Sequence, residues 1–454
     1  MSLKERLQEY AKSNMYPFHM PGHKRMLKGC YKIDMTEVEG VDDLHDPEEV
    51  IAAEQKRLAK LYGVKEAFML VGGSTVGNLA AIYATLNEND FVLIQRNCHR
   101  SVYNGAMLRH LKVNYIYPSL EENGIFLACT LEDIKAAIAK SKDLPKAIII
   151  TSPTYEGYYC DIRKIAYYCH EEKILLIVDE AHGAHLGFNE VFPNQAAKIA
   201  DITIASLHKT LPCLTQTAAM FVSGDNVNSM RLREALDIFE TSSPSYVLMN
   251  SISECLDVLE NSEDYFNNYV DNLEDFYSFS GKLNHIKVLK ESHEKKDIGK
   301  LVISTKHTNI TGIMLAEILR KKYEIETELS SFSYVLAMTS IMDSEEGFER
   351  LKKALLEIDN TLKVGEIKVS IKSGENSIKK MEVWEAKNKP SMEIMLDEAK
   401  GRISASMICL YPPGAPVLLP GEEITQEQIQ IINEALQERI HVTGLNNGLI
   451  CVVN

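Results

Sequence analysis

The stretch Ile174-Leu175-Leu176-Ile177-Val178-Asp179-Glu180-Ala181-His182 decides the fold of this chain. A run that is apolar at every position predicts a strand with both faces covered, as in the parallel sheets of α/β proteins. The run then meets Asp179, and a carboxylate at the end of a buried strand costs free energy unless a cation, a metal or a ligand matches its charge. Taken alone, Asp179 could equally be the N-cap of a helix.

Similar apolar runs occur on both sides of this stretch and predict an α/β fold with a mainly parallel sheet flanked by helices. The other predicted strands are 67–71, 91–94, 147–150, 202–205 and 218–222, with helices at 78–86, 102–110 and 161–172. After about residue 260 the pattern changes, with strands at 301–304 and 335–338 and helices at 311–323, 345–362 and 425–439. We therefore expect an N-terminal arm (1–45), a large cofactor-binding domain (46–290) and a smaller C-terminal α/β domain (291–454).

Composition excludes several classes of protein. The chain has 454 residues and a formal charge of −15, which argues against a general nucleic-acid binder. It has no apolar run long enough to cross a bilayer and no secretion signal at its charged start, so we expect no membrane partner. Nine scattered cysteines without a CxxC pair indicate a reducing compartment, hence the cytoplasm. His182 and His185 form an HxxH pair without a third ligand, so we predict no metal site.

Polar residues gather just after the predicted strands, where ligands bind in parallel α/β sheets. Residues 72–78 read GGSTVGN, and small residues and hydroxyls that open a helix can bind an anion. They do not match the nucleotide P-loop pattern. His99 follows the strand at 91–94, and alone it could simply start a helix. Lys209 follows the strand at 202–205, where it could form a Schiff base or lie on the surface of a turn.

The combination is more specific than its parts. Pyridoxal 5'-phosphate carries a phosphate, a flat ring, a ring nitrogen that must stay protonated and an aldehyde that condenses with lysine. The glycine-rich loop, His99, Asp179 and Lys209 supply one group for each of these features. The sequence therefore predicts a site for pyridoxal 5'-phosphate.

With these motifs the chain resembles the ornithine/lysine/arginine decarboxylase (Orn/Lys/Arg decarboxylase) family, within the fold type I, or aspartate aminotransferase, superfamily of pyridoxal-phosphate enzymes. The resemblance spans nearly the whole chain, and it is closest to the compact members, because the length leaves no room for the wing domain of the larger ones. Cys213 departs from the small residue expected at its position. The matching stretches are 17–24, 73–78, 96–101, 179–188, 206–212, 242–246 and 411–414.

The resemblance implies a role for each motif residue. Lys209 is expected to bind the cofactor covalently, Asp179 to pair with the ring nitrogen, and His99 and Ala181 to lie against the two faces of the ring. His182 is expected near the ring hydroxyl. The residues expected to hold the phosphate are Ser74, Thr75, Ser206 and His208, together with Thr241 and Ser242 from the neighbouring subunit.

These roles imply a homodimer with shared active sites, with the arm at residues 19–24 near the active-site mouth. The implied reaction is decarboxylation of arginine, lysine or ornithine to a polyamine precursor, with Lys209 or a nearby histidine as the proton donor to Cα. A long cationic substrate needs a carboxylate at the far end of its pocket, and the candidates are Asp42, Asp43 and Glu240.

Two alternatives stay open from the sequence. Another fold type I activity, such as an aminotransferase or an aldol-type lyase, would use the same cofactor residues, and Arg402 could then bind a substrate carboxylate. A catalytically silent regulatory homologue is the alternative of a different class, although the joint presence of His99, Asp179 and Lys209 speaks against it.

Overall fold

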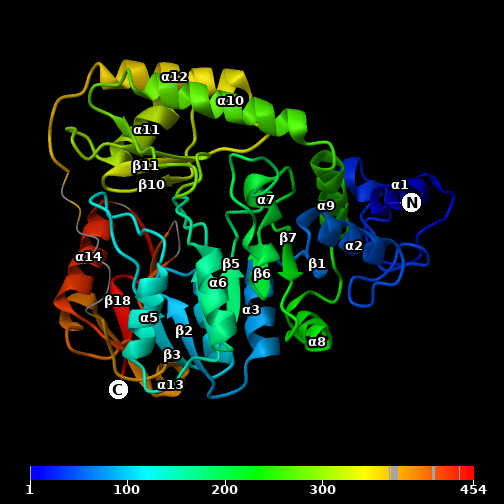
Figure 1. Cartoon of the computed structure of the whole chain (residues 1–454), viewed down its shortest axis with the longest axis horizontal. Coiled ribbons are helices and arrows are strands. Elements are labelled where there is room, and N and C mark those ends of the chain that lie inside the picture. Colours follow the sequence, from blue (N-terminus) through cyan, green and yellow to red (C-terminus); the bar gives the residue numbers. More distant parts are fainter. Residues whose placement is uncertain (1, 368, 370–376, 412–414, 439) are drawn as a thin grey trace. The chain divides into compact units, whose positions relative to one another are not determined.

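The computed structural model describes residues 2–367, 369, 377–411, 415–438 and 440–454. The chain divides into two compact units, and Figure 1 shows its helices and strands coloured by residue number. The first unit comprises Met1–Leu86 with Leu175–Asn267, and the second comprises Asn87–Ile174 with Asn268–Asn454. Each unit is discontinuous in sequence, because the chain leaves the first unit after residue 86 and returns to it at residue 175. The domain boundaries expected at residues 45 and 290 stay a prediction.

The first unit contains four adjacent strands in the order β1 (Glu66–Leu70), β7 (Ala218–Val222), β6 (Ile202–Ala205) and β5 (Leu175–Asp179). Strands β5 and β6 are parallel, whereas β7 is antiparallel to both β6 and β1. The direction reverses because β6 and β7 are joined only through the one-turn helix α7 (Leu207–Thr210), and a short connection returns the chain antiparallel. Strands β1, β5 and β6 therefore run in one direction, so their carboxyl ends lie at the same edge.

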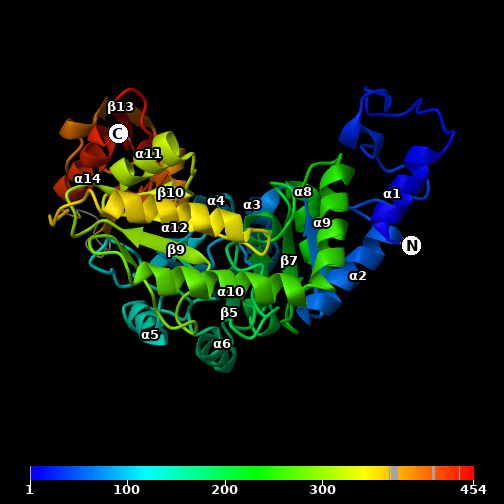
Figure 2. The same ribbon diagram turned by 90° about the horizontal axis from the view of Figure 1, so that it is seen from above.

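Helices cover this part of the sheet. Helix α3 (Gly73–Thr85) packs on the strands and on α8 (Ser229–Phe239), and α2 (Val50–Tyr62) packs on β1. Helix α3 begins five residues before the predicted start at residue 78, so the glycine-rich loop forms the first turns of the helix rather than its approach. Figure 2 shows α9 (Tyr246–Leu259) beside α1 (Leu3–Lys12) and α2.

The second unit contains three parallel strands in the order β4 (Ala147–Thr151), β2 (Phe91–Gln95) and β3 (Lys112–Ile116). Strand β3 was not predicted from the sequence, because the exposed Lys112 and the half-buried Asn114 interrupt its apolar run. The helices between these strands are α4 (Arg100–Leu108), α5 (Leu131–Ala139) and α6 (Ile162–Glu171). The fold class is thereby confirmed as α/β with a mainly parallel sheet flanked by helices.

The C-terminal part of the second unit carries an antiparallel sheet in the order β10, β11, β9, β8. Figures 1 and 2 both show α10 beside α12, and the rings of Phe276 and Phe348 join them with centroids 6.1 Å apart. The elements are β8 (Lys287–Val288), β9 (Lys300–Ser304), β10 (Leu329–Ser330), β11 (Tyr334–Met338), α10 (Glu263–Ser280), α11 (Gly312–Tyr323) and α12 (Glu345–Asp359).

A buried ion pair joins the last segment of the chain, which follows α12, to strand β2 within the second unit. Arg96, at the end of β2, lies 3.1 Å from Glu422, and it also donates to the carbonyl oxygen of Pro416 at 2.6 Å. The segment contains α13 (Val383–Asn388), α14 (Gln426–Gln437), β13 (Ser391–Met395), β14 (Ile408–Tyr411) and β18 (Leu449–Val453). Of the expected turn at 411–414, residues 412–414 lie outside the described residues.

No helix in the described part of the chain has the length and apolarity needed to cross a bilayer. Within the same residues, no group of three or more His, Cys, Asp or Glu side chains is placed to hold a metal ion.

Candidate active site

Asp179 ends strand β5 and is 1% exposed. Its carboxylate accepts hydrogen bonds from Nδ2 of Asn78 at 3.0 Å and from the backbone N–H of Ala181 at 3.1 Å. Both donors are neutral, so they do not balance the charge of the carboxylate. A buried carboxylate held in this way is suited to bind a cation.

Lys209 lies in α7, at the carboxyl end of β6. Its Nζ atom is 3.0 Å from Nε2 of His182, which is itself buried. An ammonium group can only donate, so Nε2 accepts whenever Lys209 is charged, and the imidazole then carries its proton on Nδ1. His182 and Asp179 are separated by Glu180 and the buried Ala181, so one short segment after β5 brings a carboxylate and an amine-binding imidazole to the same edge.

Two hydroxyl groups meet where α3 begins. Oγ of Ser74 is hydrogen-bonded to Oγ of Ser206, and Thr75 beside them is exposed. The first backbone N–H groups of a helix have no partner within the helix and attract anions. Ser74, Thr75 and Ser206 are therefore placed to surround an anion at the start of α3.

Glu240 stabilises the turn that precedes α3 through hydrogen bonds with its backbone. Its Oε1 atom accepts the backbone N–H groups of Val71 at 2.9 Å and Gly72 at 3.0 Å. Burial raises the pKa of Glu240, although these hydrogen bonds oppose the shift. A Cβ atom at Gly72 would lie 2.4 Å from Cγ2 of Val76, which explains the glycine. Glu240, one of the expected substrate carboxylates, thus has a structural function in this turn.

His208 is half-buried next to Lys209. Its Nδ1 atom is 2.7 Å from the carbonyl oxygen of Thr217, which fixes the proton on Nδ1. Burial lowers the pKa of His208, with the Thr217 bond opposing the shift and the positive charge of Lys209 adding to it. A neutral His208 therefore presents its Nε2 lone pair, and its expected contact with the phosphate stays a prediction.

Thr241 and Ser242 are exposed, and their expected contact with the cofactor phosphate of a neighbouring subunit stays a prediction. His45 of the arm makes two contacts that position Thr241. Its Nε2 atom is 2.9 Å from the carbonyl oxygen of Thr241, and its Nδ1 atom is 2.9 Å from Oδ1 of Asp237. Burial lowers the pKa of His45, but the two hydrogen bonds outweigh it and raise the pKa overall. Sequence reasoning missed His45, because no local pattern links the arm to residue 241.

Asp42, another candidate for the substrate carboxylate, accepts hydrogen bonds from the backbone, and its role toward a substrate stays a prediction. Its carboxylate accepts the backbone N–H groups of Glu48, Glu49 and Ile51 and so caps the start of α2. Burial raises the pKa of Asp42, but these hydrogen bonds outweigh it and lower the pKa overall. Asp43 also has a local bond, from the backbone N–H of His45.

His99 lies in the second unit, where it caps the start of α4. Its Nδ1 atom is 2.8 Å from Oγ of Ser101 and 3.3 Å from the backbone nitrogen of the same residue. The local contacts are those of a helix-start residue. The expected contact between His99 and a cofactor ring stays a prediction.

The first unit thus brings together a buried carboxylate, a lysine amine and a cluster of hydroxyls. Sequence reasoning missed Asn78, although it lies four residues after Ser74 and so on the same face of α3. These residues fit pyridoxal phosphate, because Asp179 suits a protonated ring nitrogen, Ser74 and Ser206 suit a phosphate, and Lys209 supplies the amine.

Comparison with known proteins agrees with this assignment. The family described as "Orn/Lys/Arg decarboxylase, major domain" matches residues 2–300, and "Orn/Lys/Arg decarboxylase, C-terminal domain" matches residues 373–441. The uncharacterized protein YaaO of Bacillus subtilis is 32% identical over 96% of this chain and 94% of its own length. An arginine decarboxylase of the same organism is 29% identical over 98% of this chain and 96% of its own length.

Solved structures show the same fold. The lysine decarboxylase LdcF of Francisella novicida superimposes with a TM-score of 0.82 at 19% identity, covering 100% of this chain and 81% of that one. The constitutive lysine decarboxylase of Escherichia coli gives a TM-score of 0.81 at 17% identity, covering 100% and 82%. Fold, site chemistry and the family match agree that the chain belongs to the Orn/Lys/Arg decarboxylase family and is a pyridoxal-phosphate-dependent amino acid decarboxylase of fold type I.

Proposed function

We propose that this protein decarboxylates a basic amino acid, with arginine as the first candidate and lysine or ornithine as the others. The observation that carries the proposal is the buried carboxylate of Asp179, bonded to neutral donors, on the segment that also bonds Lys209 through His182. The relatives named arginine decarboxylase match nearly the whole chain, which favours arginine.

When bound, pyridoxal phosphate supplies an aldehyde for the substrate amine and a protonated ring that accepts the electrons left when carbon dioxide departs. Asp179 stabilises the proton on the ring nitrogen. Ser74, Ser206 and the first turn of α3 hold the phosphate. His182 exchanges a proton with Nζ of Lys209, and either group then delivers the proton that replaces the carboxylate at Cα.

Carbon dioxide release tests the reaction and the substrate together. We expect release from one of arginine, lysine and ornithine in preference to the other two. Lys209→Ala should abolish turnover and remove the visible absorbance of the bound cofactor, whereas Lys198→Ala, at an exposed position, should change neither. Normal turnover by Lys209→Ala would contradict the assignment.

Transamination is the competing reaction, and Arg402 was a candidate to bind the substrate carboxylate in it. In the second unit the Arg402 guanidinium donates to the carbonyl oxygen of Val453 at 3.1 Å, so it helps to fix the end of strand β18. Formation of keto acid from all three amino acids without carbon dioxide release would favour transamination. Cofactor binding without either reaction would favour the silent regulatory homologue.

We also propose that the protein acts as a homodimer in the cytoplasm and that its reaction serves polyamine synthesis or, because decarboxylation consumes a proton, acid resistance. The arm supports the dimer, because residues 15–31 expose a group of large apolar side chains. These are Met15, Tyr16, Phe18, Met20, Met26, Leu27 and Tyr31. A cluster of this kind on a monomer usually marks an interface.

A further inference from the structure

His45, in the arm of the first unit, lies between two groups that only accept hydrogen bonds. Its Nδ1 atom is 2.9 Å from Oδ1 of Asp237 in α8, and its Nε2 atom is 2.9 Å from the backbone carbonyl oxygen of Thr241. An ionised carboxylate and a carbonyl oxygen have no proton to donate, so each ring nitrogen must supply one. Both contacts are therefore hydrogen bonds only when the imidazole is protonated on both nitrogens and positively charged.

The charges around His45 favour this protonated form. The acids beside the ring are Asp43 of the arm, Asp237 of α8 and Glu240, which follows α8. The base is Arg233 of α8, which lines the same small hollow as His45. Burial lowers the pKa of His45, but its hydrogen bonds and the charges of Asp237 and Asp43 outweigh burial and raise the pKa overall. The other residues that line the hollow do not ionise, and they are Leu44, Gln55, Phe68, Met69 and Leu236.

The link from His45 holds the segment between α8 and α9. Residues 241–243 are exposed, and the backbone N–H of Ser243 is bonded within the segment, to Oγ1 of Thr241 at 3.3 Å. The arm makes a second link at the start of α9, where the hydroxyl of Tyr246 donates to the carbonyl oxygen of Asp42. Burial raises the pKa of Tyr246, so this second link does not titrate near neutral pH. Of the two links, only the one from His45 responds to a proton in that range.

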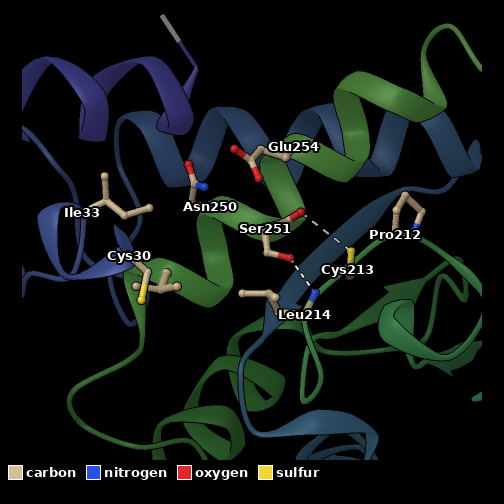
Figure 3. Close-up of a pocket in the computed structure, with 9 residues that line it drawn as sticks. Cys30, Ile33, Pro212, Cys213, Leu214, Asn250, Ser251 and Glu254 are labelled. Atoms are coloured by element: carbon tan, nitrogen blue, oxygen red, sulfur yellow. Dashed lines mark hydrogen bonds between the residues drawn. The ribbon is translucent and has the colours of Figure 1, made fainter. Parts of the chain in front are cut away.

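A cavity of about 430 Å³ lies where residues 30–33 of the arm face α9 (Figure 3). Cys30 and Ile33 of the arm line it, together with Asn250 and Ser251 of α9. Groups that line a cavity lack close contacts on one side, so residues 30–33 gain little packing energy from α9. The hydrogen bonds farther along the arm, at residues 42 and 45, matter correspondingly more for its attachment here.

We propose that His45 is a positioning residue whose second proton decides whether residues 241 and 242 are held against the arm. Both hydrogen bonds are present below pH 6.5, and one is lost as the pH rises through the raised pKa of His45 in the folded protein. The proton that stays is the one on Nδ1, because the carboxylate of Asp237 is the stronger acceptor. The lone pair of Nε2 then faces the carbonyl oxygen of Thr241 and repels it, which releases the segment.

The consequence for catalysis rests on the proposed function, in which Thr241 and Ser242 reach the phosphate of the neighbouring subunit's cofactor. Release of the segment would weaken this contact, so cofactor affinity and turnover should fall as the pH rises from about 6 to about 8. Decarboxylation consumes a proton, so the reaction would slow itself as its medium becomes alkaline. The local change at His45 does not depend on which reaction the protein catalyses.

Two substitutions imitate the two states of His45 in the full-length protein loaded with cofactor. His45→Gln is uncharged and has one nitrogen donor, like the neutral ring, whereas His45→Arg is permanently charged and has donors for both acceptors. Hydrogen–deuterium exchange of peptides that contain residues 240–246 measures how firmly the segment is held. Comparison of the proteins at one pH cancels the intrinsic effect of pH on exchange.

At about pH 6 the segment of the wild type should exchange about 5-fold more slowly than that of His45→Gln, which corresponds to one hydrogen bond. At about pH 8 these two proteins should exchange alike, while His45→Arg should stay slow at both pH values. His293→Gln, at an exposed position in the second unit, is the control and should match the wild type throughout. NMR titration of labelled histidine should place the pKa of His45 above 6.5, and Asp237→Asn should lower it.

The outcomes separate this proposal from the proposed function. A wild-type segment that exchanges as fast as that of His45→Gln at both pH values would overturn the proposal. A segment held only at the lower pH, in a chain that releases no carbon dioxide, would support the role of His45 and refute the proposed function. Cofactor affinity that falls with pH equally in the wild type and in His45→Arg would overturn the link to the phosphate. Thermal unfolding of each variant verifies that it is folded.

Discussion

At the scale of single residues, Asp179 combines a functional charge with a cost to stability. It is buried, and its two hydrogen-bond donors are neutral. Removal of an unbalanced buried charge stabilises a protein, whereas removal of the ring-nitrogen partner takes away an interaction on which the reaction depends. The two effects of one substitution therefore have opposite signs.

Asp179→Asn is predicted to lower kcat/KM by about 10²-fold or more while leaving the cofactor-free protein as stable as the wild type or more so. Carbon dioxide assays and thermal unfolding measure the two effects. Asp161→Asn is the control, because Asp161 caps α6 through the backbone N–H of Lys164 and should affect stability alone. A strongly destabilised but active Asp179→Asn would refute the cation-binding role.

The burial of Glu180, the residue after Asp179, leads us to expect that the stability of the folded protein depends on pH. It is buried, with Oε1 bonded to the backbone N–H of Ala196 at 2.8 Å, and burial raises its pKa from 4.5 to about 8. Between these values the folded protein keeps a proton on Glu180 that the unfolded chain releases. The contribution of protonated Glu180 to the free energy of unfolding is therefore fully present below pH 4.5. It is lost progressively as the pH rises to about 8.

Glu180→Gln should remove this dependence, since an amide does not titrate and its oxygen can still accept from Ala196. The free energy of unfolding of the wild type minus that of the variant should fall by several kcal/mol between pH 5 and 8, at about 1.4 kcal/mol per unit. Urea unfolding at a series of pH values measures the difference. A constant difference across this range would show that Glu180 is ionised in the folded protein.

At the scale of elements, the contact between α3 and β6 positions the anion-binding turn. A Cβ atom at Gly77 would lie 2.6 Å from Cγ2 of Ile204 in β6, and Ile204 is fully buried. Glycine at residue 77 therefore allows the helix to approach the sheet closely. Ser74 and Asn78 lie on the same helix and depend on this approach.

Gly77→Ala is predicted to destabilise the protein by about 1–3 kcal/mol through overpacking and to weaken cofactor binding. Titration with pyridoxal phosphate, followed by absorbance, measures the second effect. Gly347→Ala in α12 is the matched control, because its Cβ atom would meet only Oγ of Ser344, at 3.7 Å. That control should be neutral or slightly stabilising, and equal behaviour of the two variants would contradict the role of Gly77.

At the scale of the whole molecule, the exposed apolar side chains of the arm are relevant to the proposed dimer. Phe18 is 92% exposed and Met26 is 78% exposed, in a segment where five other large side chains are also exposed. The backbone of the arm is nevertheless held, because Arg25 donates to the carbonyl oxygens of Tyr10 and Met15. An ordered segment with exposed apolar side chains is suited to bury them against a second copy of the chain.

The double variant Phe18→Ser/Met26→Ser is predicted to shift the protein from dimer toward monomer in sedimentation experiments. Activity should fall in parallel, since Thr241 and Ser242 are proposed to reach the partner's cofactor phosphate. Met230→Ser, at a position on α8 that is 70% exposed, serves as the control and should leave the dimer intact. An unchanged dimer in the double variant would exclude this part of the arm from the interface.

The sequence by itself determined the α/β class, the family and the strands β1, β2, β4 to β7, β9 and β11, because buried strands and the motifs at their ends leave local patterns. Tertiary structure alone decided the antiparallel direction of β7, the early start of α3 and the partners of Asp179 and Glu240. Glu240 was one of three candidates for the substrate carboxylate, and only the structure shows that its Oε1 atom accepts the backbone N–H groups of residues 71 and 72. Such pairings join residues far apart in the chain, and their free energies depend on packing that no local pattern encodes.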